Sequence, residues 1–376
     1  MPKMRKAEIS VDRNCRRTLT DQLTDALRSA IYSGKWKEGD SLPTREALMA
    51  SCGVSRNVVQ AAVSRLVAEG LVCSRTRLGC KVTRSSRRVT RGRVLEIVTG
   101  SETPYWTACF SSTLHEALYE AHIDCVSLGL YYDRHDRFDD ERLEHELLRY
   151  PDIVVVKASN PRAAPIQKIL DRHDVPYVMV GMMRASARGR HPRMLCSYSP
   201  TACHDFSEFV ADCVRAKVRS VTWFACTSRE RCDPRAALEK AGIAVEVLLA
   251  NRLRQGEEHD LGGYMAAARD CMLERLRQGT LCDLLFIADD YLAMGAIPAL
   301  LESGVRIPED VRLVTHYNRG FGPILTKSIA RFEADPAACA RETARGIVEW
   351  LKTDRFPALA LPSLRYVRGD TFPVPQ

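Results

Sequence analysis

A short polar cluster after Gly53 carries the side chains that hydrogen-bond to the edges of nucleic-acid bases. Ser55, Arg56, Asn57 and Gln60 stand close together in the chain. Arginine pairs through two hydrogen bonds with guanine, and asparagine or glutamine does the same with adenine. These residue types at this spacing predict the first turns of a helix that reads DNA in the major groove.

Two amphipathic helices would hold this cluster at the surface. Thr44 and Arg45 open a short helix, a glycine-containing turn follows, and Ser55 is placed to cap the next helix. Two helices joined by such a turn form a helix–turn–helix. Apolar residues at helical spacing predict the buried faces: Leu23, Ala26, Leu27, Ala30 and Ile31 before the motif, and Val58, Val59, Ala62, Val63, Leu66 and Val67 in its second helix.

A basic hairpin is expected directly after these helices. Residues 71–74 and 80–83 have the pattern of two strands, and the turn between them contains Arg75, Arg77 and Gly79. Arginines at a hairpin tip can lie along phosphates or in the minor groove. We therefore add Thr44, Arg45 and these three residues to the predicted DNA-contact surface. The alternative interpretation is a helical bundle with an unrelated hairpin.

The charge is distributed unevenly along the 376 residues. Residues 1–93 hold 20 Lys and Arg against 8 Asp and Glu, a balance of +12, whereas the whole chain carries +8. A basic N-terminal region joined to a mildly acidic remainder indicates a nucleic-acid-binding domain attached to something else. A solvated basic face without a partner is the alternative that charge alone leaves open.

The sequence predicts three regions with different patterns. Residues 1–84 form the DNA-binding domain, and 85–93 are a polar, arginine-rich linker. Residues 94–376 alternate apolar strands with amphipathic helices, which predicts parallel sheets with helices on both faces, folded as two lobes. The expected strands are 94–99, 125–130, 153–156, 177–180, 221–225, 245–249, 284–287 and 311–315. The expected helices are 106–121, 139–149, 163–173, 202–215, 234–241, 264–278, 291–303 and 336–352.

The N-terminal region resembles the GntR family of winged helix–turn–helix regulators. The matching stretches are 34–44 (with Gly34, Gly39-Asp40 and Leu42-Pro43-Thr44), 53–56 (GVSR), 66–72 (LVAEGLV), and Arg75 with Gly79 and Val82. The resemblance implies an α+β winged helix–turn–helix fold and places Arg56, Gln60 and Gly79 at DNA-contacting positions.

The C-terminal region resembles the effector-binding domain of LacI/GalR regulators, which has the type I periplasmic-binding-protein fold. Residues 286–296 (FIADDYLAMGA) and 304–311 (GVRIPEDV) carry this resemblance. It implies an α/β bilobal domain that binds a small molecule between its lobes and dimerises. A GntR-type DNA-binding domain joined to such an effector-binding domain is the arrangement of arabinose-repressor-type regulators.

Candidate effector-binding residues lie in loops that follow predicted strands, where open α/β sheets bind ligands. Carboxylates of Asp289 and Asp290 would accept hydrogen bonds from hydroxyls, although Asp290 has the alternative role of capping the following helix. Tyr105 and Trp106 could stack on a sugar, or Trp106 could belong to the core. The other two candidates are Arg231 and Asn318.

Several protein classes are not supported by the sequence. It lacks the phosphate-binding, nucleophile-elbow and zinc-protease motifs, so we expect no enzyme and no cofactor. Its nine histidines are dispersed, and each is expected at the surface or satisfied in the core. Its 14 cysteines form no C-x-x-C pair, which argues against a metal site and for reduced thiols. Neither a signal peptide nor a transmembrane span is evident, so a cytoplasmic protein without membrane contact is expected.

Together with the two resemblances, these patterns predict a repressor of carbohydrate uptake or catabolism genes. Its partners would be a double-stranded DNA operator and a small-molecule effector, and it would act as a homodimer on a pseudo-palindrome. Two alternatives remain: an enzyme whose head only regulates its own gene, and a constitutive DNA-binding protein that has lost its ligand.

Overall fold

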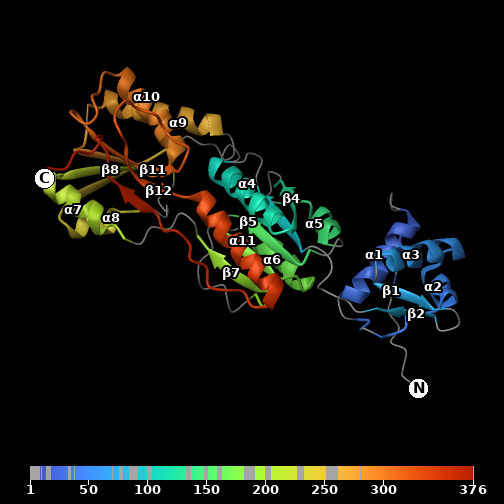
Figure 1. The fold of residues 1–376 in the computed structure, drawn as a ribbon. Coiled ribbons are helices and arrows are strands. Elements are labelled where there is room, and N and C mark those ends of the chain that lie inside the picture. The colour runs from blue at the N-terminus through green and yellow to red at the C-terminus, as the bar shows by residue number, and fades with distance from the viewer. Residues whose placement is uncertain are drawn as a thin grey trace. The chain divides into compact units, whose positions relative to one another are not determined.

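The chain divides into two compact units, Met1–Arg93 with Asp140–Asp152, and Val94–Asp139 with Ile153–Gln376 (Figure 1). The domain boundaries 1–84, 85–93 and 94–376 remain predictions. The structure is a computed structural model that describes residues 9, 11–13, 18–32, 35–37, 39–69, 71–75, 79–83, 92–99, 104–132, 137–147, 151–158, 163–181, 191–199, 205–226, 233–250, 261–279 and 281–375.

The first unit contains a winged helix–turn–helix, as the sequence predicted. Its described elements are α1 (Leu19–Tyr32), α2 (Arg45–Cys52), α3 (Arg56–Ala68), β1 (Val72–Arg75), β2 (Gly79–Val82) and α5 (Asp140–Leu147). Leu23 and Leu27 of α1 and Val59 and Leu66 of α3 are fully buried in one cluster. Burial of these apolar stripes fixes the orientation of α3 on α1. Val67 is an exception to the prediction, because it is exposed.

The second unit contains two sheets, each of which carries one lobe. The sheet of the first lobe has the order β4-β3-β5-β6-β7, and β3, β5, β6 and β7 run parallel. Helices α4 and α11 pack against each other and against one face of this sheet. The elements are β3 (Arg93–Thr99), α4 (Tyr105–Glu120), β4 (Asp124–Leu130), β5 (Ile153–Lys157), α6 (Ala163–Arg172), β6 (Tyr177–Val180), β7 (Met194–Tyr198) and α11 (Pro336–Thr353).

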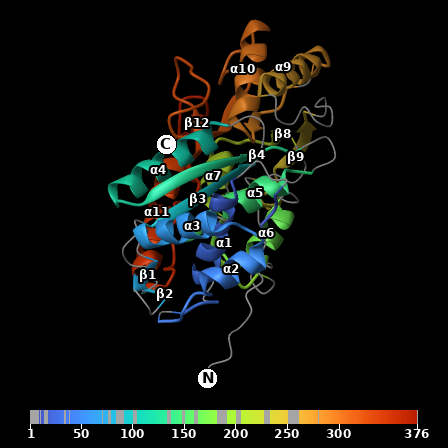
Figure 2. The same ribbon diagram turned by 90° about the vertical axis from the view of Figure 1, so that its right-hand side faces the viewer.

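The sheet of the second lobe has the order β13-β12-β11-β10-β8-β9, in which only the edge strand β13 is antiparallel. One face packs against α7 and α8, and the other against α9 and α10, which lie side by side (Figure 2). The elements are α7 (Ser207–Arg215), β8 (Ser220–Ala225), α8 (Arg235–Lys240), β9 (Ala244–Leu249), α9 (Leu261–Arg277), β10 (Leu284–Ile287), α10 (Asp290–Glu302), β11 (Arg312–Asn318), β12 (Ala330–Ala334) and β13 (Arg365–Val367).

Each predicted strand and helix of the second region has an observed counterpart, but three strands were missed. These are β7, β12 and β13. The β12 segment, ARFEA, lacks a continuous apolar run because Arg331 and Glu333, which pair with each other, alternate with its alanines and phenylalanine. Among the described residues no helix is long and apolar enough to cross a membrane, and the described cysteines are free thiols.

Candidate functional site

The predicted base-reading residues form an exposed polar face on α3. Val59, Ala62, Val63 and Leu66 turn into the core, and Arg56, Asn57 and Gln60 lie on the opposite side of the helix. The side chains of Arg56 and Asn57 have no hydrogen bond or ion pair with the described residues around them. Gln60 Nε2 makes a 3.3 Å hydrogen bond to Ser64 Oγ. The first turns of α3 therefore present free donors and acceptors to solvent.

The turn between α2 and α3 has the geometry that the motif requires. Gly53 ends α2 with φ +63°, a left-handed conformation that glycine adopts without strain. Thr44 caps the start of α2, and its Oγ1 accepts a 3.2 Å hydrogen bond from Ala47 N. Ser55 stands at the N-cap position of α3, but its side chain makes no capping hydrogen bond, contrary to the expected cap. Its hydroxyl is consequently exposed beside Arg56.

The hairpin adjacent to α3 places two more of the predicted residues at its tip. Arg75 at the end of β1 lies opposite Gly79 at the start of β2, in an antiparallel register. Gly79 has φ +76° and is exposed. Arg77 lies outside the described residues. Arg45 is half-buried on the first turn of α2.

Ion pairs hold α3 in place at its far end. Arg65 of α3 pairs with Asp21 of α1. Arg28 of α1 donates from Nε to Glu69, just after α3, at 2.9 Å. These charges are satisfied within the unit. The unpaired positive charge of α3 is therefore concentrated at its N-terminal turn, in Arg56.

The second candidate site follows from strand order. In the first-lobe sheet the strand order reverses between β3 and β5, because β4 lies on one side of β3 and β5 lies on the other. In the second-lobe sheet it reverses between β8 and β10. Ligands of open α/β sheets bind at such switch points, outside the carboxyl ends of the strands. Tyr105 and Trp106 begin the helix after β3, and Asp289 and Asp290 follow β10. The predicted residues thus lie where the topology favours a ligand.

Asp289 and Asp290 have different surroundings. Asp289 caps α10, because its Oδ1 accepts hydrogen bonds from Tyr291 N at 2.8 Å and Leu292 N at 3.2 Å. The capping role considered for Asp290 therefore belongs chiefly to its neighbour. Asp290 is buried, and its Oδ2 accepts a 2.7 Å hydrogen bond from Asn318 Nδ2 at the end of β11. Burial and then the Asp289 carboxylate raise the pKa of Asp290 to about 7.

Tyr105 connects the first-lobe helix α4 to the second lobe. Its backbone N–H donates to Tyr291 Oη at 2.8 Å, and its own hydroxyl donates to the Arg319 carbonyl at 3.0 Å. Its ring stacks on Phe321, with the ring centroids 4.8 Å apart. Gly320 makes this approach possible, since a Cβ there would stand 2.5 Å from the Tyr105 hydroxyl. One face of the predicted stacking ring is thus occupied by Phe321.

Trp106 is partly buried, and its ring packs against core residues. It stacks on Phe110 at 5.0 Å and packs against the hydrophobic clusters of both lobes. Its indole Nε1 is nevertheless buried without a hydrogen-bond partner. The structure brings Tyr105, Asp290 and Asn318 toward the carboxyl edge of the second sheet, whereas Arg231 lies outside the described residues.

The described cations near these residues are paired. Arg319 bonds to Glu333 at 2.8 Å and to Asp335, and Arg235 forms an ion pair of 2.7 Å with Asp233 while lying over the Trp223 ring. Arg319, Arg235 and Phe321 were not among the candidates predicted from the sequence, because no motif or periodicity marks them. With its cations neutralised, the described part of this edge suits an uncharged ligand.

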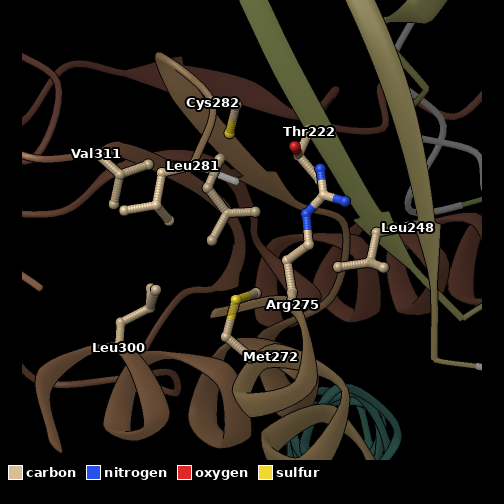
Figure 3. Close-up of a pocket in the computed structure, with 9 residues that line it drawn as sticks. Thr222, Leu248, Met272, Arg275, Leu281, Cys282, Leu300 and Val311 are labelled. Atoms are coloured by element: carbon tan, nitrogen blue, oxygen red, sulfur yellow. The ribbon is translucent and has the colours of Figure 1, made fainter. Parts of the chain in front are cut away.

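A small cavity elsewhere in the second lobe is not suited to an effector (Figure 3). Its volume is about 10 Å³, room for about one water molecule. Its lining residues include Leu281 and Cys282 before β10 and Val311 before β11, so it lies at the amino edge of the sheet. Leu248, Met272 and Leu300 make most of its other walls apolar.

The raised pKa of Asp290 predicts a specific pH dependence of stability. The folded protein retains this proton up to about pH 7, whereas the unfolded chain releases it near pH 4. The free energy of unfolding therefore loses a contribution as pH rises through this interval. Asp290→Asn should remove that contribution. Urea titrations should therefore show that the free energy of unfolding falls less between about pH 5 and pH 7.5 in the variant than in the wild type. Equal losses in both proteins would contradict the prediction.

Two family models match the chain. The family model described as "Bacterial regulatory proteins, gntR family" matches residues 19–82. The model described as "Periplasmic binding protein-like domain" matches residues 224–372. The first match covers α1, α2, α3 and the β1–β2 hairpin, and the second begins in the last two residues of β8 and covers the second-lobe strands β9 to β13. The chain joins a GntR-type DNA-binding domain to a periplasmic-binding-protein-like domain. This confirms the predicted fold class, with the GntR-type domain carrying the exposed face of α3.

Solved structures resemble the chain mainly in fold. A LacI family transcriptional regulator from Arthrobacter sp. FB24, in complex with lactose, aligns with a TM-score of 0.57 and 18% identity over 76% of this chain and 100% of that one. The transcription regulator GntR from Chromobacterium violaceum aligns with a TM-score of 0.55 and 18% identity over 74% and 99%. Identities this low establish the shared fold alone.

A curated relative matches over a short stretch. The HTH-type transcriptional repressor PurR of Pasteurella multocida is 39% identical over 61 residues, which are 15% of this chain. The match spans 18% of the length of that repressor.

Proposed function

We propose that this chain is a ligand-responsive transcriptional repressor that binds operator DNA as a homodimer in the cytoplasm. The observation that carries the proposal is that Arg56 and Asn57 are exposed at the start of α3 in a GntR-type domain and have no partner among the described residues. In a helix–turn–helix the N-terminal residues of the second helix contact base edges. The predicted DNA-contact surface also includes Thr44, Arg45, Ser55, Gln60, Arg75, Arg77 and Gly79.

We further propose that the effector is a carbohydrate or a related neutral metabolite. Asp290 and Asn318 supply hydrogen-bonding groups at the carboxyl edge of the second-lobe sheet, and the described cations there are paired. The Arthrobacter structure of the same fold holds lactose. Tyr105, Trp106, Arg231 and Asp289 complete the proposed site, with Asp289 acting through the position of α10. Regulation of carbohydrate uptake or catabolism genes would follow from such an effector.

Titration of labelled duplexes tests DNA binding. One duplex would carry the region upstream of the gene itself, and the other a scrambled sequence of the same base composition. We expect tighter binding to the first, and a steep loss of affinity between about 50 and 200 mM salt because phosphate contacts release counterions. Equal affinity for both duplexes at every salt concentration would contradict a specific regulator.

A ligand-responsive regulator requires that binding of the effector change the affinity of the protein for DNA. Binding of an effector to one conformation shifts the population of the other. We expect an aldose to raise the melting temperature of the full chain and to change its affinity for the upstream duplex. An aldose that is converted to product would instead support an enzyme, and a protein that binds DNA but responds to no small molecule would support a constitutive DNA-binding protein.

A further inference from the structure

His316 is a buried histidine whose ring has no partner among the described residues. It lies on β11 and is 6% exposed, and neither ring nitrogen has a hydrogen bond to this part of the chain. Burial lowers its pKa to about 4, so the ring is neutral at physiological pH and offers one N–H donor and one acceptor. Buried polar groups without partners are rare and destabilise the folded state. This histidine contradicts the expectation of a satisfied core residue.

Two more unpaired polar atoms lie toward the same face of the sheet. Side chains alternate along a strand, so His316 and Asn318 point to the same side as Val314. Val314 belongs to the cluster between the sheet and helices α7 and α8, and Trp106 packs against that cluster. Asn318 Oδ1 and Trp106 Nε1 are both buried, and neither has a hydrogen-bond partner in the described part of the chain. The His316 ring and the Asn318 amide oxygen therefore lie on one side of the sheet toward its carboxyl edge, and the Trp106 side chain packs against the cluster that covers this side.

We propose that His316 is a specificity-determining residue of the effector site, where it binds a hydroxyl pair of an uncharged ligand together with Asn318 and Trp106. The three side chains offer two donors, His316 N–H and Trp106 N–H, and two acceptors, the second His316 nitrogen and Asn318 Oδ1. Two neighbouring hydroxyl groups match this set, since each hydroxyl both donates and accepts. The inference rests on the proposed function and adds a residue to its ligand site.

The ligand-free protein offers the first test. His316→Leu replaces the ring by an apolar side chain of similar size, so no unpaired nitrogen remains buried. We expect the melting temperature of the full chain to rise by about 2–4 °C. Thr315→Val is the matched control, because Thr315 is buried on the opposite face of the same strand, where its hydroxyl bonds to the His316 carbonyl at 2.9 Å. It should lower the melting temperature or leave it unchanged. A fall for His316→Leu would overturn the proposal.

The second test measures ligand binding. D-glucose, D-galactose, D-ribose and L-arabinose would each be titrated into wild-type protein by thermal shift, and any that bind would be titrated into the variants. We expect His316→Leu to bind at least about 10-fold more weakly, the loss of roughly one to two hydrogen bonds. His316→Gln, which keeps a donor and an acceptor, should retain more affinity, and Thr315→Val should retain all of it.

The outcomes distinguish the proposed carbohydrate effector from the proposed role of His316. If the wild-type chain responds to none of the four aldoses, the proposed carbohydrate effector is wrong and this inference falls with it. If the wild-type chain responds and His316→Leu binds equally well, the proposed function stands and the assignment of His316 is wrong.

Discussion

Arg56→Ala is expected to weaken binding to the upstream duplex about 5- to 150-fold, while binding to a scrambled duplex of the same length changes much less. A side chain that makes paired hydrogen bonds to a base contributes about 1–3 kcal/mol to discrimination. Arg56 is exposed at the first position of α3 and has no partner among the described residues. Fluorescence anisotropy with both duplexes at one fixed salt concentration measures the effect.

Arg65→Ala provides the matched control. It removes the same charge from the same helix, but Arg65 lies near the opposite end of α3 and pairs with Asp21. Affinity for both duplexes should change less than about threefold, the loss of one surface ion pair and one distant charge. Circular dichroism should show that both variants remain folded. An equal loss on the two duplexes for Arg56→Ala would show that this residue contacts phosphate and does not read a base.

The exposed face of α3 could be predicted because one local rule determines it. Apolar residues at 3.6-residue spacing fix which side of α3 is buried, and Arg56, Asn57 and Gln60 must then be exposed. The rule was less accurate at the end of the helix, where Val67 is exposed.

The sheet edges where the candidate residues lie could be predicted from the sequence, but the contacts of their side chains could not. Strand order alone brings the segments after β3 and β10 to switch points. The roles of Asp289 and Asp290 depend on which carboxylate faces the first N–H groups of α10, and adjacent residues of the same type give no signal for that. The stacking of Tyr105 on Phe321 joins residues more than 200 positions apart. Such contacts depend on tertiary packing, which composition and periodicity do not encode.

A buried ion pair in the first lobe gives the prediction with the largest effect on stability. Glu96 on β3 is 0% exposed and Lys157 on β5 is 6% exposed, and Lys157 Nζ lies 2.8 Å from Glu96 Oε1. Ser127 donates to Glu96 Oε2 at 2.5 Å, and His115 Nε2 lies 3.1 Å from the same oxygen. Hydrogen bonds from His115 and the charge of Lys157 outweigh the effect of burial and lower the pKa of Glu96 to about 2.

Glu96→Met and Lys157→Met should each lower the free energy of unfolding by about 3–5 kcal/mol, because each leaves a buried charge without its partner. The double variant should lose much less than the sum, since two methionines of similar volume leave no unpaired charge. Ser127→Ala, which removes one hydrogen bond to the same carboxylate, should cost only about 1 kcal/mol. Urea unfolding of the wild type, the two single methionine variants and the double variant measures this double-mutant cycle. A cost under about 1 kcal/mol for each single methionine variant would contradict the prediction.

The pH dependence of this cycle has a definite sign. The carboxylate of Glu96 has a folded pKa of about 2 and an ordinary value of 4.5, so its stabilising contribution is complete above about pH 4.5 and is lost as pH falls toward 2. The cost of Glu96→Met should therefore shrink below about pH 4.5. Burial lowers the pKa of Lys157, which is consistent with a cation that depends on this carboxylate.

The same pair should also affect the ligand response, because it anchors the helix that carries two candidate site residues. Lys157 Nζ donates to the Thr107 carbonyl in the first turn of α4 at 3.3 Å, directly after Tyr105 and Trp106. If Lys157→Met releases this turn, aldose binding should weaken even at temperatures where the variant is fully folded. The double variant restores charge balance but not this hydrogen bond, so it should recover stability without recovering binding. Recovery of both would show that Lys157 acts on α4 only through the stability of the first lobe.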